Sequence, residues 1–71
     1  MIANMEHYRV FYYVAKHKSI SQAAENLYIS QPAVSQSIKL LEQSLNCKLF
    51  FRTAKGVRLT PEGEKIFPYI E

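Results

Sequence analysis

Cysteine is nearly absent from this sequence of 71 residues, in which Cys47 is the only one. A single cysteine excludes an internal disulfide and is typical of proteins from a reducing compartment. No apolar run approaches the length of a membrane-spanning helix, and residues 1–4 lead directly into a polar segment without the pattern of a signal peptide. We therefore expect a cytoplasmic protein with no membrane segment.

Residues that build catalytic and metal centres are also scarce. The two histidines, His7 and His17, are too far apart on a predicted helix to share a metal ion, and both are expected at the surface. With two glycines there is no glycine-rich phosphate loop, and no grouping of serine, histidine and acid is present. Cys47 is interpreted as a small buried hydrophobe, with a redox-sensitive thiol as the alternative. The sequence predicts no catalytic residue, no metal and no cofactor, and an enzyme is the least favoured class.

The composition supports one small folded domain, since apolar residues make up 48% of the chain and aromatic residues 13%. The net charge of +3 is modest, but its distribution is uneven. Between residues 30 and 60 a single acid, Glu42, accompanies five cations: Lys39, Lys48, Arg52, Lys55 and Arg58. The remainder carries four cations and five acids. A surface that faces phosphate groups requires such a concentration of positive charge.

Residues 30–45 form the stretch around which the rest of the chain is organised. Ser30 is suited to cap the first turn of a helix, and Pro32 is placed where no intrahelical donor is needed. Apolar residues then recur at spacings of four, three and four, which predicts a helix with one buried face: Val34, Ile38, Leu41 and Leu45. The helix is expected to end near Asn46, because asparagine tolerates the left-handed conformation that closes many helices.

The opposite face of this predicted helix differs from an ordinary solvated face, which is rich in Glu and Lys. It carries uncharged hydrogen-bonding side chains near its start and a cation one turn later: Gln31, Ser35, Gln36 and Lys39. Such a composition favours contact with another polar surface. Base edges in the major groove of DNA are one, because a glutamine amide offers the paired donor and acceptor that adenine requires.

Two shorter helices are expected before it. Residues 4–16 have an apolar stripe rich in aromatics, which is interpreted as core, with a platform for stacking single-stranded bases as the less favoured alternative. Residues 19–28 form the second helix, with Ser19 or Ser21 as the cap. A short connection is expected to bury Ile29 in the core. Two helices joined by a tight turn, with the polar face on the second, form a helix-turn-helix.

Residues 48–53 and 57–60 are rich in β-branched and aromatic residues, and the intervening turn contains one glycine. We expect a two-stranded hairpin with a basic tip formed by Arg52, Lys55 and Arg58, placed to reach phosphates or the adjacent minor groove. The alternative is a solvated loop whose cations serve solubility. Beside a helix of the recognition type, a wing that contacts DNA is the favoured interpretation.

A last helix is predicted from Thr60, which is followed by a first-turn proline and by acids near the positive end of the helix dipole. Pro68 lies inside this helix and is expected to remove one hydrogen bond or to bend it. Apolar residues cluster towards its end: Ile66, Phe67, Tyr69 and Ile70. Because this pattern has no stop signal, the helix is expected to pack on another copy of the chain or to belong to a longer protein.

Several motifs, in this order along the chain, resemble one family. They are FYYVA at 11–15, SISQAAENL at 19–27, SQPAVSQ at 30–36, LE at 41–42, LF at 49–50, RT at 52–53 and GVRLTPEG at 56–63. This ordered set covers nearly the whole chain and resembles the N-terminal domain of LysR-type transcriptional regulators. Gln36 departs from the common pattern at a position where arginine is frequent, Lys18 and Asn46 where glycine is common, and Phe51 where an acid is frequent.

The resemblance implies a mainly α fold, namely a winged helix-turn-helix with a three-helix core, a two-stranded β-hairpin wing and the start of a linker helix. Residues 1–60 would form the DNA-binding domain, and residues 61–71 would begin the linker or dimerisation helix. The effector-binding domain that normally follows is absent, so the chain resembles an excised domain. A small-molecule effector is expected only for that missing domain.

The implied partner is double-stranded DNA, with the helix at 30–45 in the major groove and the basic wing at 48–60 on the backbone or minor groove. The resemblance implies that Gln31, Pro32, Ser35 and Gln36 face base edges and nearby phosphates. It implies that Arg52 and Arg58 provide the contacts of the wing. Together with the cations placed by the charge pattern, the expected DNA-binding residues are Ser30, Gln31, Pro32, Ser35, Gln36, Lys39, Arg52, Lys55 and Arg58. A homodimer of the full-length protein would pair its linker helices through Ile66, Phe67 and Ile70.

A competing interpretation from another class is a protein-interaction module, since winged helices also dock proteins and the last helix offers an apolar face. The two interpretations differ in their response to salt. Contacts with phosphates weaken steeply as salt rises, whereas an apolar docking surface responds little.

Overall fold

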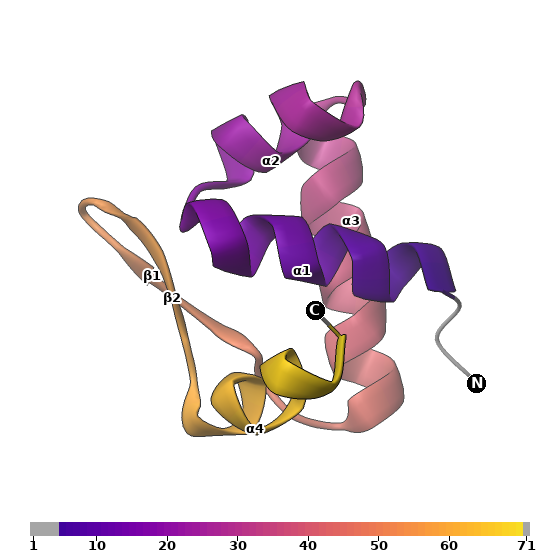
Figure 1. Ribbon diagram of the computed structural model, residues 1–71, viewed down its shortest axis with the longest axis vertical. Coiled ribbons are helices and arrows are strands. Elements are labelled where there is room, and N and C mark those ends of the chain that lie inside the picture. The colour runs from indigo at the N-terminus through magenta and orange to yellow at the C-terminus, as the bar shows by residue number, and fades with distance from the viewer. Residues whose placement is uncertain (1–4, 71) are drawn as a thin grey trace.

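The computed structural model describes residues 5–70 and has four helices and a two-stranded antiparallel sheet. In chain order the elements are α1 (Met5–His17), α2 (Ile20–Leu27), α3 (Gln31–Leu45), β1 (Phe50–Thr53), β2 (Gly56–Leu59) and α4 (Pro61–Ile70). In Figure 1, α1 crosses α3, α2 lies at one end of this pair, and the hairpin projects to the side. This arrangement confirms the predicted winged helix-turn-helix. No helix in the described range is long and apolar enough to cross a membrane.

Local signals explain where the helices of the helix-turn-helix begin. The Ser19 hydroxyl accepts a 3.1 Å hydrogen bond from the Gln22 amide at the start of α2, so Ser19 is the cap in place of Ser21. The Ser30 hydroxyl accepts an equivalent 3.2 Å bond from the Ala33 amide at the start of α3. Each bond satisfies one of the backbone donors that the first turn leaves free.

Three left-handed residues close the helices, namely Lys18 (φ 56°), Tyr28 (φ 59°) and Asn46 (φ 57°). The end predicted at Asn46 is confirmed. The burial predicted for Ile29 is wrong, because this side chain is 37% exposed. Its amide donates to the Ala24 carbonyl at 3.1 Å, so the chain turns back on the end of α2 and directs Ile29 outward before α3 starts.

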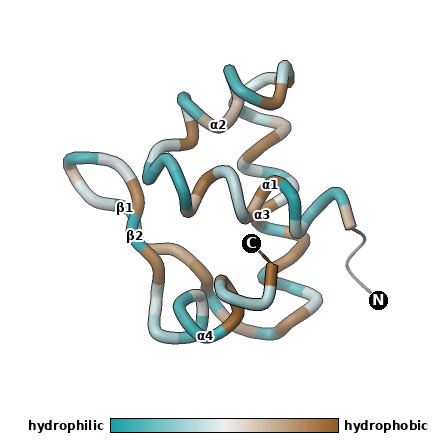
Figure 2. Tube along the Cα trace, viewed as in Figure 1, coloured by the Kyte–Doolittle hydropathy of each residue, from teal (hydrophilic) through white to brown (hydrophobic). Residues whose placement is uncertain are grey.

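The core lies between α1, α2, α3 and the base of the hairpin. In Figure 2, hydrophobic and hydrophilic segments alternate along these elements, as expected where one face of each is buried. Its largest fully buried side chains are Phe11, Leu41, Leu49, Val10, Val14 and Val34. Two further predictions about burial are wrong. His7 is only 9% exposed, because it precedes Val10 and Phe11 by three and four residues and shares their helix face. Leu45 is 36% exposed, because it lies in the last turn of α3 at the edge of the domain.

The hairpin pairs Phe50 with Leu59, Phe51 with Arg58, Arg52 with Val57, and Thr53 with Gly56. Its turn therefore contains only Ala54 and Lys55, one residue fewer than predicted. The first strand begins at Phe50 and not at Lys48, because the preceding backbone groups bond to α3 and to the Thr60 hydroxyl.

The Thr60 side chain caps α4, as predicted, by accepting a 3.0 Å bond from the Gly63 amide. The helix continues through Pro68 to Ile70. The side chains expected to mediate dimerisation, Ile66, Phe67 and Ile70, are partly buried against the core of their own domain. The Phe67 ring stacks on Tyr12 with centroids 5.7 Å apart. A large part of the apolar face of α4 is thus used within the chain.

Candidate nucleic-acid interface

The first turns of α3 present a polar surface to solvent. All but one of the side chains expected to contact DNA from this helix are exposed, and Ser35 is half-buried: Ser30, Gln31, Pro32, Ser35, Gln36 and Lys39. Within residues 5–70, no hydrogen bond involves the side-chain amide of Gln31 or Gln36. Both amides therefore have their donors and acceptor available for an external partner.

A groove of about 300 Å³ separates this surface from the wing. Ser35 and Lys39 of α3 lie on one side of it, and Arg52 of β1 lies on the other. The floor is apolar and includes Val14, Ile20, Ile38, Phe50 and Val57. The structure thus brings the predicted recognition helix and one predicted wing arginine to a single concave surface.

The two wing arginines lie on opposite faces of the hairpin. Directly paired residues share a face, so Arg52 lies with Val57 on the face turned towards the helices, and Arg58 lies with Phe51 on the outer face. Only Lys55 is in the turn. The predicted basic tip with all three cations is therefore wrong, because the register distributes them over both faces and the turn.

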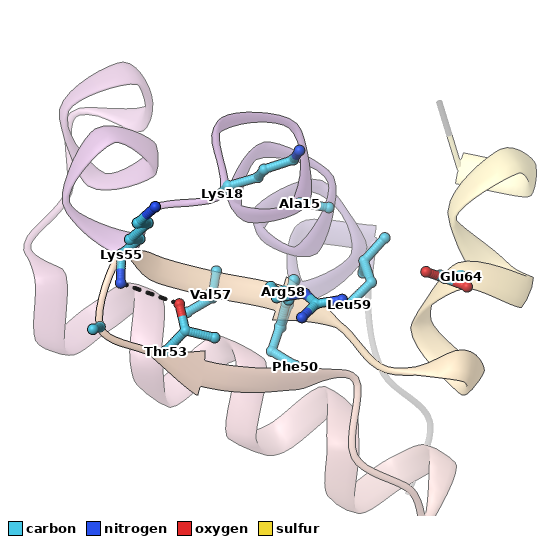
Figure 3. Close-up of a pocket in the computed structure, with 10 residues that line it drawn as sticks. Ala15, Lys18, Phe50, Thr53, Lys55, Val57, Arg58, Leu59 and Glu64 are labelled. Carbon is cyan, nitrogen blue, oxygen red and sulfur yellow. Dashed lines mark hydrogen bonds between the residues drawn. The ribbon is translucent and has the colours of Figure 1, made fainter.

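A second hollow, of about 670 Å³ and open to solvent, lies along the other edge of the hairpin. Lys18, Lys55 and Arg58 line it together with Glu64 of α4, as Figure 3 shows. The sequence interpretation did not include Lys18 among the wing cations. Its one sequence signal is a lysine at a helix end where the family resemblance leads one to expect glycine.

Most cations of this surface have no acidic partner in the described part of the chain. The ion pairs there are Arg9 with Glu6, at 3.3 Å, and Lys48 with Glu42, at 3.8 Å. The charges of Lys39, Arg52, Lys55 and Arg58 are therefore available to an external anion. Among residues 5–70, no three His, Cys, Asp or Glu side chains are placed to hold a metal ion.

The sequence interpretation also gave no role to Glu42, whose carboxylate accepts hydrogen bonds from the backbone at the base of the wing. One signal was present, since Glu42 is the single acid among the five cations between residues 30 and 60. The partners of its carboxylate are seven and eight residues away, beyond the reach of helical periodicity.

Comparison with known proteins places this architecture in a family. The model of the bacterial regulatory helix-turn-helix proteins of the lysR family matches residues 5–64. The HTH-type transcriptional activator AmpR of Citrobacter freundii is 45% identical over 62 residues, which are 87% of this chain and 21% of AmpR. The RuBisCO operon transcriptional regulator of Allochromatium vinosum is 44% identical over 69 residues, or 97% of this chain and 23% of that protein. The chain spans about a fifth of the length of these relatives.

Solved structures agree with this comparison. The oxidized form of Corynebacterium glutamicum OxyR superimposes with a TM-score of 0.93 at 36% identity, covering 99% of this chain and 22% of OxyR. The BenM DBD/catB site 1 DNA complex gives a TM-score of 0.90 at 36% identity, covering 94% of this chain and 75% of that chain. AmpR and the Allochromatium vinosum protein are named as transcriptional regulators and not as enzymes. Because the family model matches most of its length, the chain belongs to the lysR family of bacterial regulatory helix-turn-helix proteins.

Proposed function

We propose that this chain binds double-stranded DNA with sequence specificity, placing the helix at 30–45 in the major groove and the wing at 48–60 on the backbone or minor groove. The observation that carries the proposal is the groove where Ser35 and Lys39 of α3 face Arg52 of the wing. Cations suited to phosphates meet there, and the same helix carries the exposed amides of Gln31 and Gln36, which are suited to bases.

The solved relatives support the proposal. BenM DBD and CbnR DBD are both known in complexes with DNA, at TM-scores of 0.90 to this chain and identities of 36% and 27%. The fold that those proteins use in the complexes is thus the fold of this chain. Its own free amides and unpaired cations supply the chemistry that a duplex requires.

The proposed contacts divide into two kinds. Gln31 and Gln36 read base edges, because their amides match the donor and acceptor of adenine. Ser30, Pro32 and Ser35 lie at base edges and nearby phosphates, where Ser35 can bind either group. The remaining members of the set contact the phosphate backbone: Lys39, Arg52, Lys55 and Arg58. The contacts of these four cations with phosphates give affinity that depends on salt and not on sequence.

We further propose that residues 1–60 form the DNA-binding domain and that residues 61–71 begin a linker helix in a longer cytoplasmic regulator. In the full-length protein, α4 would pair with its counterpart in a homodimer, and an effector would bind a further domain. Since Ile66, Phe67 and Ile70 are already partly buried within the chain, the second copy would cover only their exposed parts and the neighbouring Tyr69, which is 90% exposed. Sedimentation equilibrium of the full-length protein and of a Tyr69→Asp variant tests the pairing.

Fluorescence anisotropy tests the main proposal. The chain is titrated onto a duplex selected from a random pool and onto a scrambled duplex of the same length, over a range of salt concentrations. We expect preference for the selected duplex and an affinity that falls steeply as salt rises. If the affinity is weak and equal for both duplexes and does not change with salt concentration, the proposal of DNA binding is rejected and a protein partner is favoured.

A further inference from the structure

Glu42 connects the recognition helix to the base of the wing. Its carboxylate accepts a 2.8 Å hydrogen bond from the Leu49 amide and a longer one, at 3.4 Å, from the Phe50 amide. Leu49 immediately precedes β1, and Phe50 is the first residue of that strand. The Glu42 side chain is only 13% exposed. A single carboxylate of α3 therefore accepts two backbone donors at the point where the wing begins.

The same short segment is also fixed on its other side. The Thr60 hydroxyl donates to the Lys48 carbonyl at 2.6 Å, and the Thr60 amide donates to the Leu49 carbonyl at 3.0 Å. The segment at Lys48 and Leu49 thus bonds to α3 through Glu42 and to the start of α4 through Thr60. Of these contacts, only those of Glu42 connect the wing to the helix that carries the recognition surface.

The ion pair between Glu42 and Lys48 does not explain this arrangement. The Lys48 ammonium is 3.8 Å from the carboxylate, and its side chain is 81% exposed, so solvent screens the pair and it contributes little. Hydrogen bonds from backbone amides to a largely buried carboxylate are stronger and have a defined direction. The position of the base of the wing relative to α3 is therefore set by the hydrogen bonds from the Leu49 and Phe50 amides to Glu42.

We propose that Glu42 is a positioning residue for DNA recognition: its bonds to the base of the wing hold Arg52 across the groove from Ser35 and Lys39. The inference rests on the proposed function, because it concerns how two parts of one DNA-binding surface are kept in register. In β1, Arg52 follows Phe50, which Glu42 contacts, by two residues and lies on the same face of the hairpin. A shift at the base of the strand moves Arg52 directly.

A role of Glu42 through its charge and a role in positioning the wing predict opposite effects of its removal on DNA binding, so the direction of the change distinguishes them. Removing an acid from a surface that binds DNA strengthens binding if charge alone matters. Removing the acceptor that fixes the wing weakens specific binding instead. We expect Glu42→Ala to weaken binding to the selected duplex about tenfold, and Glu42→Gln, which keeps one acceptor oxygen and loses the charge, to stay within about threefold of the native chain.

Three further variants complete the experiment. Glu42→Asp keeps the charge but is too short by one methylene, so we expect weaker binding; it also serves if Glu42→Ala does not fold. Glu25→Ala removes an exposed acid of α2 that has no such contact, and we expect no loss of affinity for the selected duplex.

Arg52→Ala should lower the affinity about fivefold in the native chain but less than about twofold in the Glu42→Ala background, because Arg52 is already displaced there. Exchange of the Leu49 amide, followed by NMR, should accelerate in Glu42→Ala and not in Glu42→Gln.

The outcomes separate this inference from the proposal beneath it. If the native chain shows no preference for the selected duplex, the proposed function fails and the inference fails with it. If the preference is present but Glu42→Ala binds as well as or better than the native chain, only the inference is overturned. Losses from Glu42→Ala and Arg52→Ala that simply add would likewise show that Glu42 does not act through Arg52, even where Leu49 exchange accelerates.

Discussion

Gly56 and Lys18 are in direct backbone contact. A Cβ atom added at Gly56 would lie 2.3 Å from the Lys18 carbonyl oxygen, and that oxygen accepts a 3.2 Å hydrogen bond from the Val57 amide. Lys18 is itself left-handed, with φ at 56°, which directs the last carbonyl of the α1 turn towards the wing. The second strand is thus fixed to the end of α1, while Glu42 fixes the first strand to α3.

Gly56→Ala should destabilise the fold by about 3 kcal/mol, because φ at this position is +132° and the new methyl group would overlap the Lys18 oxygen. Urea unfolding followed by circular dichroism measures the change. Ala54→Ser, an exposed substitution in the neighbouring turn, should stay within about 0.5 kcal/mol of the native chain. Equal stability of Gly56→Ala and the native chain would contradict the close contact.

Thr60→Val should destabilise the fold by about 2 kcal/mol. Thr60 is 2% exposed, and its hydroxyl both donates to the Lys48 carbonyl and accepts from the Gly63 amide, so valine leaves one partly buried acceptor and one buried donor without partners. Thr53→Val is the matched control, because the Thr53 hydroxyl also makes two backbone contacts but is exposed. Thermal and urea unfolding should rank the Thr60 variant as the less stable; the reverse order would contradict the role assigned to burial.

Gln31→Ala should reduce discrimination between the selected and scrambled duplexes by about 1–3 kcal/mol, because one amide that matches a base is lost. Equal losses on the two duplexes for Gln31→Ala would show that this side chain does not read bases.

Lys55→Ala should weaken binding to both duplexes alike and lower the slope of log affinity against log salt by about one. Anisotropy titrations at several salt concentrations measure both quantities.

Arg52→Ala should weaken DNA binding more than Arg58→Ala. The two arginines carry the same charge, but Arg52 lies beside the groove with Ser35 and Lys39, whereas Arg58 is on the outer face with Phe51. We expect a loss of about fivefold for Arg52→Ala, roughly 1 kcal/mol, and about half that free energy for Arg58→Ala. The comparison is made on the selected duplex at one salt concentration. A larger loss for Arg58→Ala would place the DNA on the outer face of the wing.

Much of the fold is encoded in signals that act over one helical turn, and these could be predicted from the sequence. Ser30 caps the amide three residues later, Asn46 adopts the left-handed conformation, and the apolar spacing indicates which side of α3 is buried. The polar face with Gln31 and Gln36 follows from the same period. For this reason the helix predicted at 30–45 differs from α3 by only one residue, since Ser30 is its cap and the helix proper is Gln31–Leu45.

Tertiary structure alone decided what depends on contacts between distant elements. His7 is buried and Ile29 is exposed because burial is set by the helices that cover each position, not by the polarity of the side chain. The separation of Arg52 from Arg58 follows from a two-residue turn and one strand register, and a shift of one strand by one residue would place both arginines on the same face. Glu42 acquires its role only because folding brings the Leu49 amide to its carboxylate. Local signals along the chain therefore specify the helices and their polar faces, while long-range packing specifies how the wing is held beside them.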